Sequence, residues 1–278
     1  MTGRSASRSS HRLRRLTTIR RATETDIPAF LEVMSIAFGV PNRRPSVHTW
    51  AFEQDDGHLL VAERDGRVVA TGASIGFGST AWIGAIAVRP EARGSKLGTR
   101  MTEAAIEAVG PRDTLLLLAS PSGRPIYEQM GFEPEGAFRV FSGPAHAKPA
   151  DRDDVRPATA ADHAGIRALD VLATGEDRHA PVDSALEGAV VADGGVALRP
   201  PYGARPIIAT DANAGRALLD AVLEPGIRLA APQANVPAVD ALLAHGCEER
   251  HGVERMRRGA PVTWNPELQW GVFSLFFG

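Results

Sequence analysis

Hydrophobic and polar positions alternate along the chain with two different periods, and each period predicts one kind of element. Apolar residues at helical spacing predict an amphipathic helix that begins at a cap, Thr25 or Asp26, and ends at Gly39. Its apolar positions are Ile27, Phe30, Leu31, Met34 and Phe38. Residues 46–54 predict a second, short helix. Shorter apolar runs, flanked by polar residues, predict strands at 19–23, 58–63 and 68–73, the last two joined by an Asp-Gly hairpin turn.

Two further strand–helix units follow in the first half. An apolar run at 81–88 predicts a buried strand, and Leu97, Met101, Ala105 and Val109 give the helix after it an apolar face. A second run at 114–119 precedes a short helix that begins near Pro125 and is capped at Gly131. The order β-α-α-β-β-β-α-β-α predicts an α/β (α+β) fold.

The second half repeats the beginning of the first. Residues 155–162 (VRPATAAD) echo 19–26 (IRRATETD) at a distance of 136 residues, after a linker at 143–150. Strands at 207–209 and 228–231 and helices at 213–222 and 237–246 follow. We therefore expect a diverged second copy of the same fold at 151–278. For the aromatic segment 262–278 we expect a strand that completes a sheet or packs between the two copies, with an aromatic substrate wall as the alternative.

Composition narrows the class of protein. The 278 residues carry 31 basic and 33 acidic side chains, so no overall positive charge argues for nucleic acid. The single cysteine, Cys247, excludes an internal disulfide and fits a reducing compartment, and it is expected to be buried and unreactive. No apolar run reaches the length of a membrane span. Residues 1–17 are rich in Arg and Ser but lack an apolar segment, so they predict a disordered tail and not a secretory signal, with contact to nucleic acid as the alternative. We expect a cytoplasmic protein without nucleic-acid or membrane partners.

The strand at 81–88 leads into a turn that is suited to hold phosphate. Residues 93–98 read RGSKLG and open the next helix, where backbone N–H groups have no helical acceptor and the helix dipole is positive. Glycines allow an anion to approach the backbone closely, and Arg93 and Lys96 add positive charge. The spacing fits neither a Walker A loop nor the dinucleotide fingerprint.

Val88, Pro90, Arg93 and Gly98 fall on a pattern that resembles the acyl-CoA pyrophosphate loop of the GNAT acetyltransferase superfamily. Lys96 departs from it, because the family usually has glycine there, and a positive φ at a lysine would cost conformational energy. Downstream, the strand at 114–119 and the sequence from Tyr127 to Phe132, Tyr-x-x-x-Gly-Phe, resemble the second GNAT signature.

The order of elements also matches the layout of the family, so the resemblance implies a mixed central sheet with helices on both faces. It implies an acetyl-CoA-dependent N-acetyltransferase that acts without a metal on a primary amine. We expect a small-molecule acceptor, with a peptide or protein as the alternative. The resemblance places the acyl carbonyl near the backbone of Ala87 and Val88, where a bulge separates two strands, and makes Tyr127 the acid that protonates the CoA sulfur. The full set of expected acetyl-CoA contacts is Ile86, Ala87, Val88, Arg93, Gly94, Ser95, Lys96, Leu97, Gly98 and Ser122.

The proton acceptor is open from sequence alone. His48, Glu53, Asp55 and Asp56 lie where the acceptor-side loop is expected, and water is the alternative base. Because Cys247 belongs to the second half, we expect direct transfer without an acyl-cysteine intermediate. The alternative to an enzyme is a non-catalytic acyl-CoA-binding or interaction protein with the same fold.

The second copy provides an internal control. Leu242 stands four residues before Gly246, where the first copy has Tyr127 before Gly131, and leucine cannot donate a proton. If Gly98 is matched with Gly215, Asp211 falls near the start of the second helix, where it would cap that helix and repel a pyrophosphate. We expect a catalytically silent second copy that shapes the acceptor pocket or forms an oligomer interface, the latter giving a homodimer.

Overall fold

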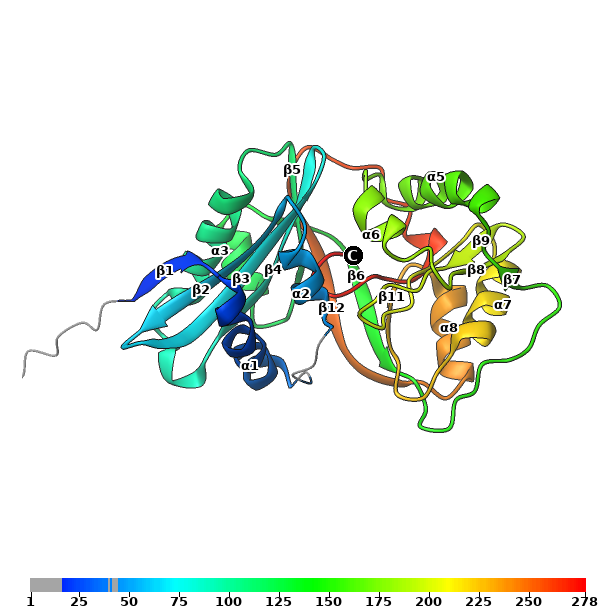
Figure 1. Ribbon diagram of the computed structural model, residues 1–278, viewed down its shortest axis with the longest axis horizontal. Coiled ribbons are helices and arrows are strands. Elements are labelled where there is room, and N and C mark those ends of the chain that lie inside the picture. The colour runs from blue at the N-terminus through cyan, green and yellow to red at the C-terminus, as the bar shows by residue number, and fades with distance from the viewer. Residues whose placement is uncertain (1–16, 40, 42–44) are drawn as a thin grey trace, which may run out of the picture.

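The computed structural model describes residues 17–39, 41 and 45–278, and its first half follows the predicted order of elements (Figure 1). The strands are β1 (Thr18–Arg21), β2 (Gly57–Arg64), β3 (Arg67–Phe77), β4 (Thr80–Val88), β5 (Thr114–Ala119) and β6 (Glu133–Ser142). The helices are α1 (Ile27–Phe38), α2 (Val47–Phe52), α3 (Leu97–Val109) and α4 (Arg124–Gln129). The predicted disordered tail lies outside the described residues, apart from Thr17.

Local signals explain where these helices begin and end. Gly39 adopts the left-handed conformation and stops α1 at the residue that the sequence indicates. The Ser46 side chain accepts a hydrogen bond from the Thr49 backbone N–H and caps α2. Asp65 and Gly66 both have positive φ, as the hairpin turn between β2 and β3 requires.

The second half contains the elements that the repeat predicts, together with several short ones that it does not. Its strands are β7 (Arg156–Pro157), β8 (Val190–Ala192), β9 (Gly195–Ala197), β10 (Ile207–Ala209), β11 (Arg228–Pro232), β12 (Glu248–Gly259) and β13 (Gln269–Gly271). Its helices are α5 (His163–Thr174), α6 (His179–Asp183), α7 (Ala212–Val222) and α8 (Val236–Ala244).

The sequence repeat has a physical counterpart at the first helix of each half. Thr23 donates its backbone N–H to Asp26, and Arg20 pairs with the same carboxylate at 2.7 Å. In the second half, Thr159 donates its backbone N–H to Asp162, which pairs with Arg156 at 2.7 Å. Both Thr–Asp pairs form capping boxes, so the repeated residues serve one purpose: they start a helix directly after a strand.

The strands form two sheets, and the larger one draws on both halves. Its order is β1-β2-β3-β4-β5-β12-β6-β11, in which β12 of the second half and β6, the last strand of the first half, lie side by side and antiparallel. β12 also pairs with β5 of the first half, and β6 pairs with β11 of the second. Figure 1 shows these long strands crossing between the two halves. The smaller sheet has the order β13-β10-β9-β8-β7.

This exchange of strands was not predicted. The sequence predicts two units, 18–145 and 151–278, each with its own sheet and helices. The structure does give each half a sheet and helices, but the first sheet is continuous only because β12 lies between β5 and β6. A break between the units would therefore remove a central strand from the first half.

Opposite faces of the large sheet carry different helices. Leu60 and Ala62 of β2 point into a core with α3, whereas the alternating Leu59 and Val61 point into a core with α1 and α2. The second half packs against the α1–α2 face. The predicted C-terminal aromatic segment contributes Phe273, Phe276 and Phe277 to this shared core, in addition to the short strand β13.

Candidate acyl-CoA site

The site begins at a bulge in β4. The pairing of β3 with β4 shifts where Thr71 pairs with Ala87 and Ala73 with Gly84, so that Ala85 and Ile86 oppose Gly72 alone. Ala85 takes a positive φ of 53°, and its carbonyl oxygen accepts a hydrogen bond of 2.8 Å from the Thr71 hydroxyl. The bulge re-aims the last residues of β4, as the sequence analysis expects at this place.

Beyond its first residues, β4 separates from β5. The parallel ladder between them covers only Thr80–Trp82 of β4 and Thr114–Leu116 of β5. Among the described strands, β4 from Ile83 to Val88 therefore has no ladder partner on the β5 side. Ile86, Ala87 and Val88, the expected contacts of the acyl group and the pantetheine arm, all lie on this separated segment, which we call the slot edge.

The turn after the slot edge is exposed and tightly organised. The Arg93 Nε donates to the Val88 carbonyl oxygen at 3.2 Å, so the guanidinium lies over the end of β4. The Ser95 hydroxyl donates to the Ala92 carbonyl oxygen at 2.9 Å. Gly94 and Lys96 adopt φ angles of 78° and 56°, so Lys96 does hold the left-handed conformation that makes glycine usual in the family.

The start of α3 is open to an anion. Lys96 is the N-cap residue, and no side chain caps the helix. Within the described part of the chain, the backbone N–H groups from Gly94 to Gly98 have no acceptor. The nearest heavy atom to a Cβ built on Gly98 is Ile126 Cδ1 at 3.9 Å, which also places α4 beside this helix start. Leu97 is buried and anchors the first turn.

On the other side of the slot, β5 leads into α4 and its tyrosine. The Tyr127 ring meets Phe132 edge-on with 6.1 Å between centroids, on the face of the sheet that α3 covers. Its hydroxyl has no hydrogen-bond partner among the described residues, and burial of the ring raises the pKa of Tyr127 to about 12. Ser122 is exposed and shares a hydrogen bond of 3.2 Å with Ser120.

The four candidate proton acceptors are not brought together. Asp56 pairs with Arg112 and lies 3.5 Å from His58, beside Gly76 and away from the slot edge. Glu53 is exposed at the end of α2, and the adjacent loop carries the exposed Asp55.

His48 is connected to β4 through a single aromatic ring. It sits between the rings of Phe30 and Phe276, each 5.5 Å away between centroids, and Phe276 in turn covers Gly84. Burial lowers the pKa of His48 to about 4, so its imidazole is uncharged at neutral pH.

A groove of about 660 Å³ begins where β5 ends and crosses the exchanged strands. Its residues come from β5 and α4 of the first half, from β6, and from β12 and Gln233 of the second half. The charged ones are Arg124, Arg139, Glu249 and Glu254. Sequence reasoning missed this groove because it did not assign a strand to 248–259. A signal was available in the match between MGF (130–132) and HGC (245–247). A strand directly follows the first of these sequences, so the match predicts a strand after the second as well.

The protein is of the α/β class, with a bulged strand, β4, that parts from its neighbour and leads into a helix start without a side-chain cap. Residues 18–134 match the family model described as the Acetyltransferase (GNAT) domain. This part of the chain belongs to the GNAT superfamily, whose members use acetyl-CoA.

Solved structures share the fold over nearly the whole chain. A protein assigned as an acetyltransferase from Pyrococcus horikoshii superimposes with a TM-score of 0.81 at 23% identity, covering 94% of this chain and 96% of that one. A GCN5-related N-acetyltransferase from Sphaerobacter thermophilus gives a TM-score of 0.61 at 16% identity, covering 90% and 98%. At these identities the likeness shows the fold alone. Comparison with curated proteins gave no match.

Two kinds of feature are absent from the described residues. No group of three or more His, Cys, Asp or Glu side chains is placed there to hold a metal ion. No helix in the same part of the chain is both long and apolar enough to cross a bilayer.

Proposed function

We propose that the protein is an acetyl-CoA-dependent N-acetyltransferase that transfers the acetyl group directly to the primary amine of a small molecule. The observation that carries this proposal is the pairing of an open helix start with a separated strand. The N–H groups from Gly94 to Gly98 are free to bind a pyrophosphate, and the slot edge beside them is free to bind an extended pantetheine arm.

The chemistry follows from the groups along the slot. The amine nitrogen attacks the thioester carbonyl, and backbone N–H groups near Ala87 stabilise the negative charge that develops on its oxygen. The C–S bond then breaks, and Tyr127, whose raised pKa keeps it protonated at neutral pH, supplies the proton to the departing sulfur. The amine proton goes to water, because a pKa of about 4 makes the His48 imidazole too weak a base to hold it at neutral pH.

Two observations support a small acceptor and direct transfer. The groove of about 660 Å³ falls in the volume range of small-molecule sites, although its carboxylates, Glu249 and Glu254, are already paired with Arg139 and Arg124. Cys247 is buried in the second half and burial raises the pKa of its thiol, which disfavours a thiolate nucleophile.

Calorimetric titration with acetyl-CoA tests the binding step. We expect one site per chain, weakened in Arg93→Ala and unchanged in Arg216→Ala, which removes an exposed arginine from the first turns of α7 in the second half. A panel of amines, assayed by release of free thiol, then tests turnover. Absence of binding would instead favour a non-catalytic protein that has kept the fold.

A further inference from the structure

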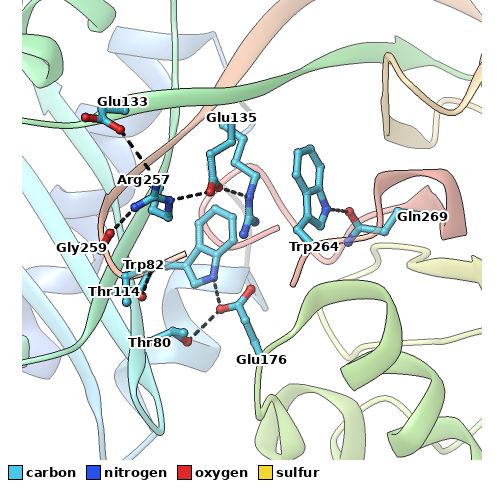
Figure 2. A network of polar contacts seen from close by, with 12 residues as sticks. Thr80, Trp82, Thr114, Glu133, Glu135, Glu176, Arg257, Gly259, Trp264 and Gln269 are labelled. Carbon is cyan, nitrogen blue, oxygen red and sulfur yellow. Dashed lines mark hydrogen bonds and ion pairs between the residues drawn. The ribbon is translucent and has the colours of Figure 1, made fainter. Parts of the chain in front are cut away.

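One carboxylate of the second half reaches into the first half beside the slot. Glu176 follows α5 directly and is only 2% exposed. Its Oε2 accepts hydrogen bonds from the Thr80 hydroxyl at 2.9 Å and from the Trp82 indole N–H at 2.8 Å, both on β4. Figure 2 shows the carboxylate pointing up at the Trp82 ring from the side of the second half. A charged side chain is buried at this depth only when other groups hold it.

The place of these two contacts along β4 is informative. Thr80–Trp82 is the whole segment of β4 that pairs with β5, and the strands separate directly after it. Glu176 therefore holds the last paired residues, the point from which the slot opens. The width of a gap between two diverging strands depends on the direction in which each one leaves that point.

Trp82 is also held from the opposite side by β12, the exchanged strand. The Arg255 guanidinium lies over the Trp82 ring at 5.0 Å and over the Trp264 ring at 4.7 Å. Its Nε donates to Glu135 of β6 at 2.9 Å, and the same carboxylate accepts from Arg257 at 2.8 Å (Figure 2). Trp82 itself has no exposed surface, so it is fixed between the Glu176 carboxyl group and the Arg255 guanidinium, which both belong to the second half.

The polar groups around Trp82 cost more free energy than an apolar core in the same place would. Glu176 Oε1 and Arg255 Nη2 are buried without a hydrogen-bond partner among the described residues. Apolar side chains of similar size would fill the same space without unpaired polar atoms. Retention of such groups beside a binding slot calls for a role in the geometry of that slot.

We propose that Glu176 is a positioning residue: by fixing Thr80 and Trp82 it sets the opening between β4 and β5, so that acyl-CoA binding in the first half depends on the second half. This inference rests on the proposed function for its ligand, but its structural content, the restraint of β4, stands separately. The second half thereby becomes part of the acyl-CoA site without contacting the ligand.

The decisive comparison is between Glu176→Ala and Asp170→Asn. Asp170 forms a buried pair with Arg178 at 2.6 Å, and Arg178 donates to the carbonyl oxygen of Gly278, which lies against the Trp82 ring. The Asp170 variant therefore loosens the same surroundings but leaves both hydrogen bonds from β4 to Glu176 in place. We expect the dissociation constant for acetyl-CoA to rise at least tenfold in Glu176→Ala and to stay within twofold in Asp170→Asn. Glu176→Gln keeps an oxygen that can accept from Trp82 and should recover most of the affinity.

Two readouts separate this proposal from general destabilisation and from the proposed function. The KM for acetyl-CoA should rise in Glu176→Ala while the KM for the amine does not. In the ligand-free protein, hydrogen–deuterium exchange should accelerate at the slot edge in Glu176→Ala but not in Asp170→Asn. Equal exchange in the two variants would overturn the proposal, even if the wild type proved not to bind acetyl-CoA.

Discussion

The two halves build the same strand–helix turn and leave it in opposite states. At the start of α3, the N-cap residue Lys96 offers no side-chain acceptor, and the first N–H groups remain free. At the start of α7, Asp211 Oδ1 accepts from the backbone N–H groups of Asn213 at 2.8 Å and Ala214 at 3.0 Å. The N–H groups at the start of α7 are therefore already bound to an anion, the Asp211 carboxylate of the chain itself.

The gap between strands beside the helix start also differs: it is open in the first half and filled in the second. In the second half β13 pairs with β10 and contacts β11, so it occupies the position in which β4 and β5 part in the first half. Trp270 of β13 is 2% exposed, and its ring would lie 2.0 Å from a Cβ on Gly215, whereas the space around Gly98 is open. The accompanying pocket of about 400 Å³ is lined by Asp154, Asp193 and Asp211, whose charges repel a pyrophosphate.

The comparison also corrects the alignment of the two turns. The sequence analysis matches Gly98 with Gly215, but Gly98 is the second residue of its helix and Gly215 the fourth. Alignment by helix start places Lys96 opposite Asp211. Fold and site chemistry are thus separable: the same backbone turn binds an external anion or an internal one, depending on the cap residue and on what fills the slot.

The largest effect is expected at Tyr127 of α4, where the corresponding helix of the second half, α8, has Leu242. Tyr127→Phe should lower kcat by about 10²- to 10⁴-fold, the usual contribution of general acid catalysis, with unchanged affinity for acetyl-CoA. Steady-state kinetics and calorimetry measure the two quantities. Tyr202→Phe alters the other tyrosine, buried in the interface core, and is the control that should retain turnover. Full activity of Tyr127→Phe would remove the main chemical difference between the halves.

The next largest effect is expected at Trp270, whose side chain fills the gap between strands in the second half. Trp270→Ala should cost about 3–5 kcal/mol of unfolding free energy, as truncation of a buried Trp does, and urea denaturation measures it. We expect acetyl-CoA still to bind at one site per chain, because Asp211 continues to occupy the start of α7. Two sites in this variant would mean that Trp270 alone closes the second half.

The local parts of this comparison were readable from sequence. The strand–turn–helix from 81 to 109 and the unit from Thr114 to Gly131 were predicted within a few residues, because apolar runs, a helix-starting proline and capping glycines mark them. The capping role of Asp211 was predicted for the same reason and is confirmed. Such signals act over a single turn and need no knowledge of the rest of the fold.

Long-range features had no such signal. β12 reads EERHGVERMRRG, a sequence typical of a solvated surface, yet Arg255 and Met256 are buried because two strands and two tryptophans surround them. Glu176 likewise follows a helix, where a charged residue is normally exposed. The burial of both side chains depends on the exchange of strands, which is a property of the whole chain.

A smaller effect tests the cap residue directly. Lys96→Asp replaces the ammonium group by a carboxylate and gives the first half the residue type of the second. A negative charge at the helix start opposes an anionic ligand, so we expect about a tenfold loss of acetyl-CoA affinity, or about 1.4 kcal/mol. Calorimetry measures it, with Glu103→Asp, an exposed change of no net charge further along α3, as the control. Unchanged affinity would show that Lys96 lies away from the bound ligand.

The smallest effect separates the charge of Lys96 from its backbone conformation. The left-handed conformation costs a non-glycine residue about 1–2 kcal/mol, which glycine does not lose. Glycine has a greater entropy in the unfolded chain, however, and this offsets about 0.5–1 kcal/mol of the gain. Lys96→Gly should therefore stabilise the fold by about 0.5–1 kcal/mol in urea denaturation at constant m value. Lys148→Gly, which changes the other lysine of the chain at a position without positive φ, should give no such gain.

The acetyl-CoA affinity of Lys96→Gly then shows what the strained lysine contributes. If the variant gains stability but loses affinity, the positive charge of Lys96 contributes to binding and outweighs the strain of its backbone. If it gains both, Lys96 is a cost without a benefit, and the open state of the first helix start is due to its free N–H groups alone.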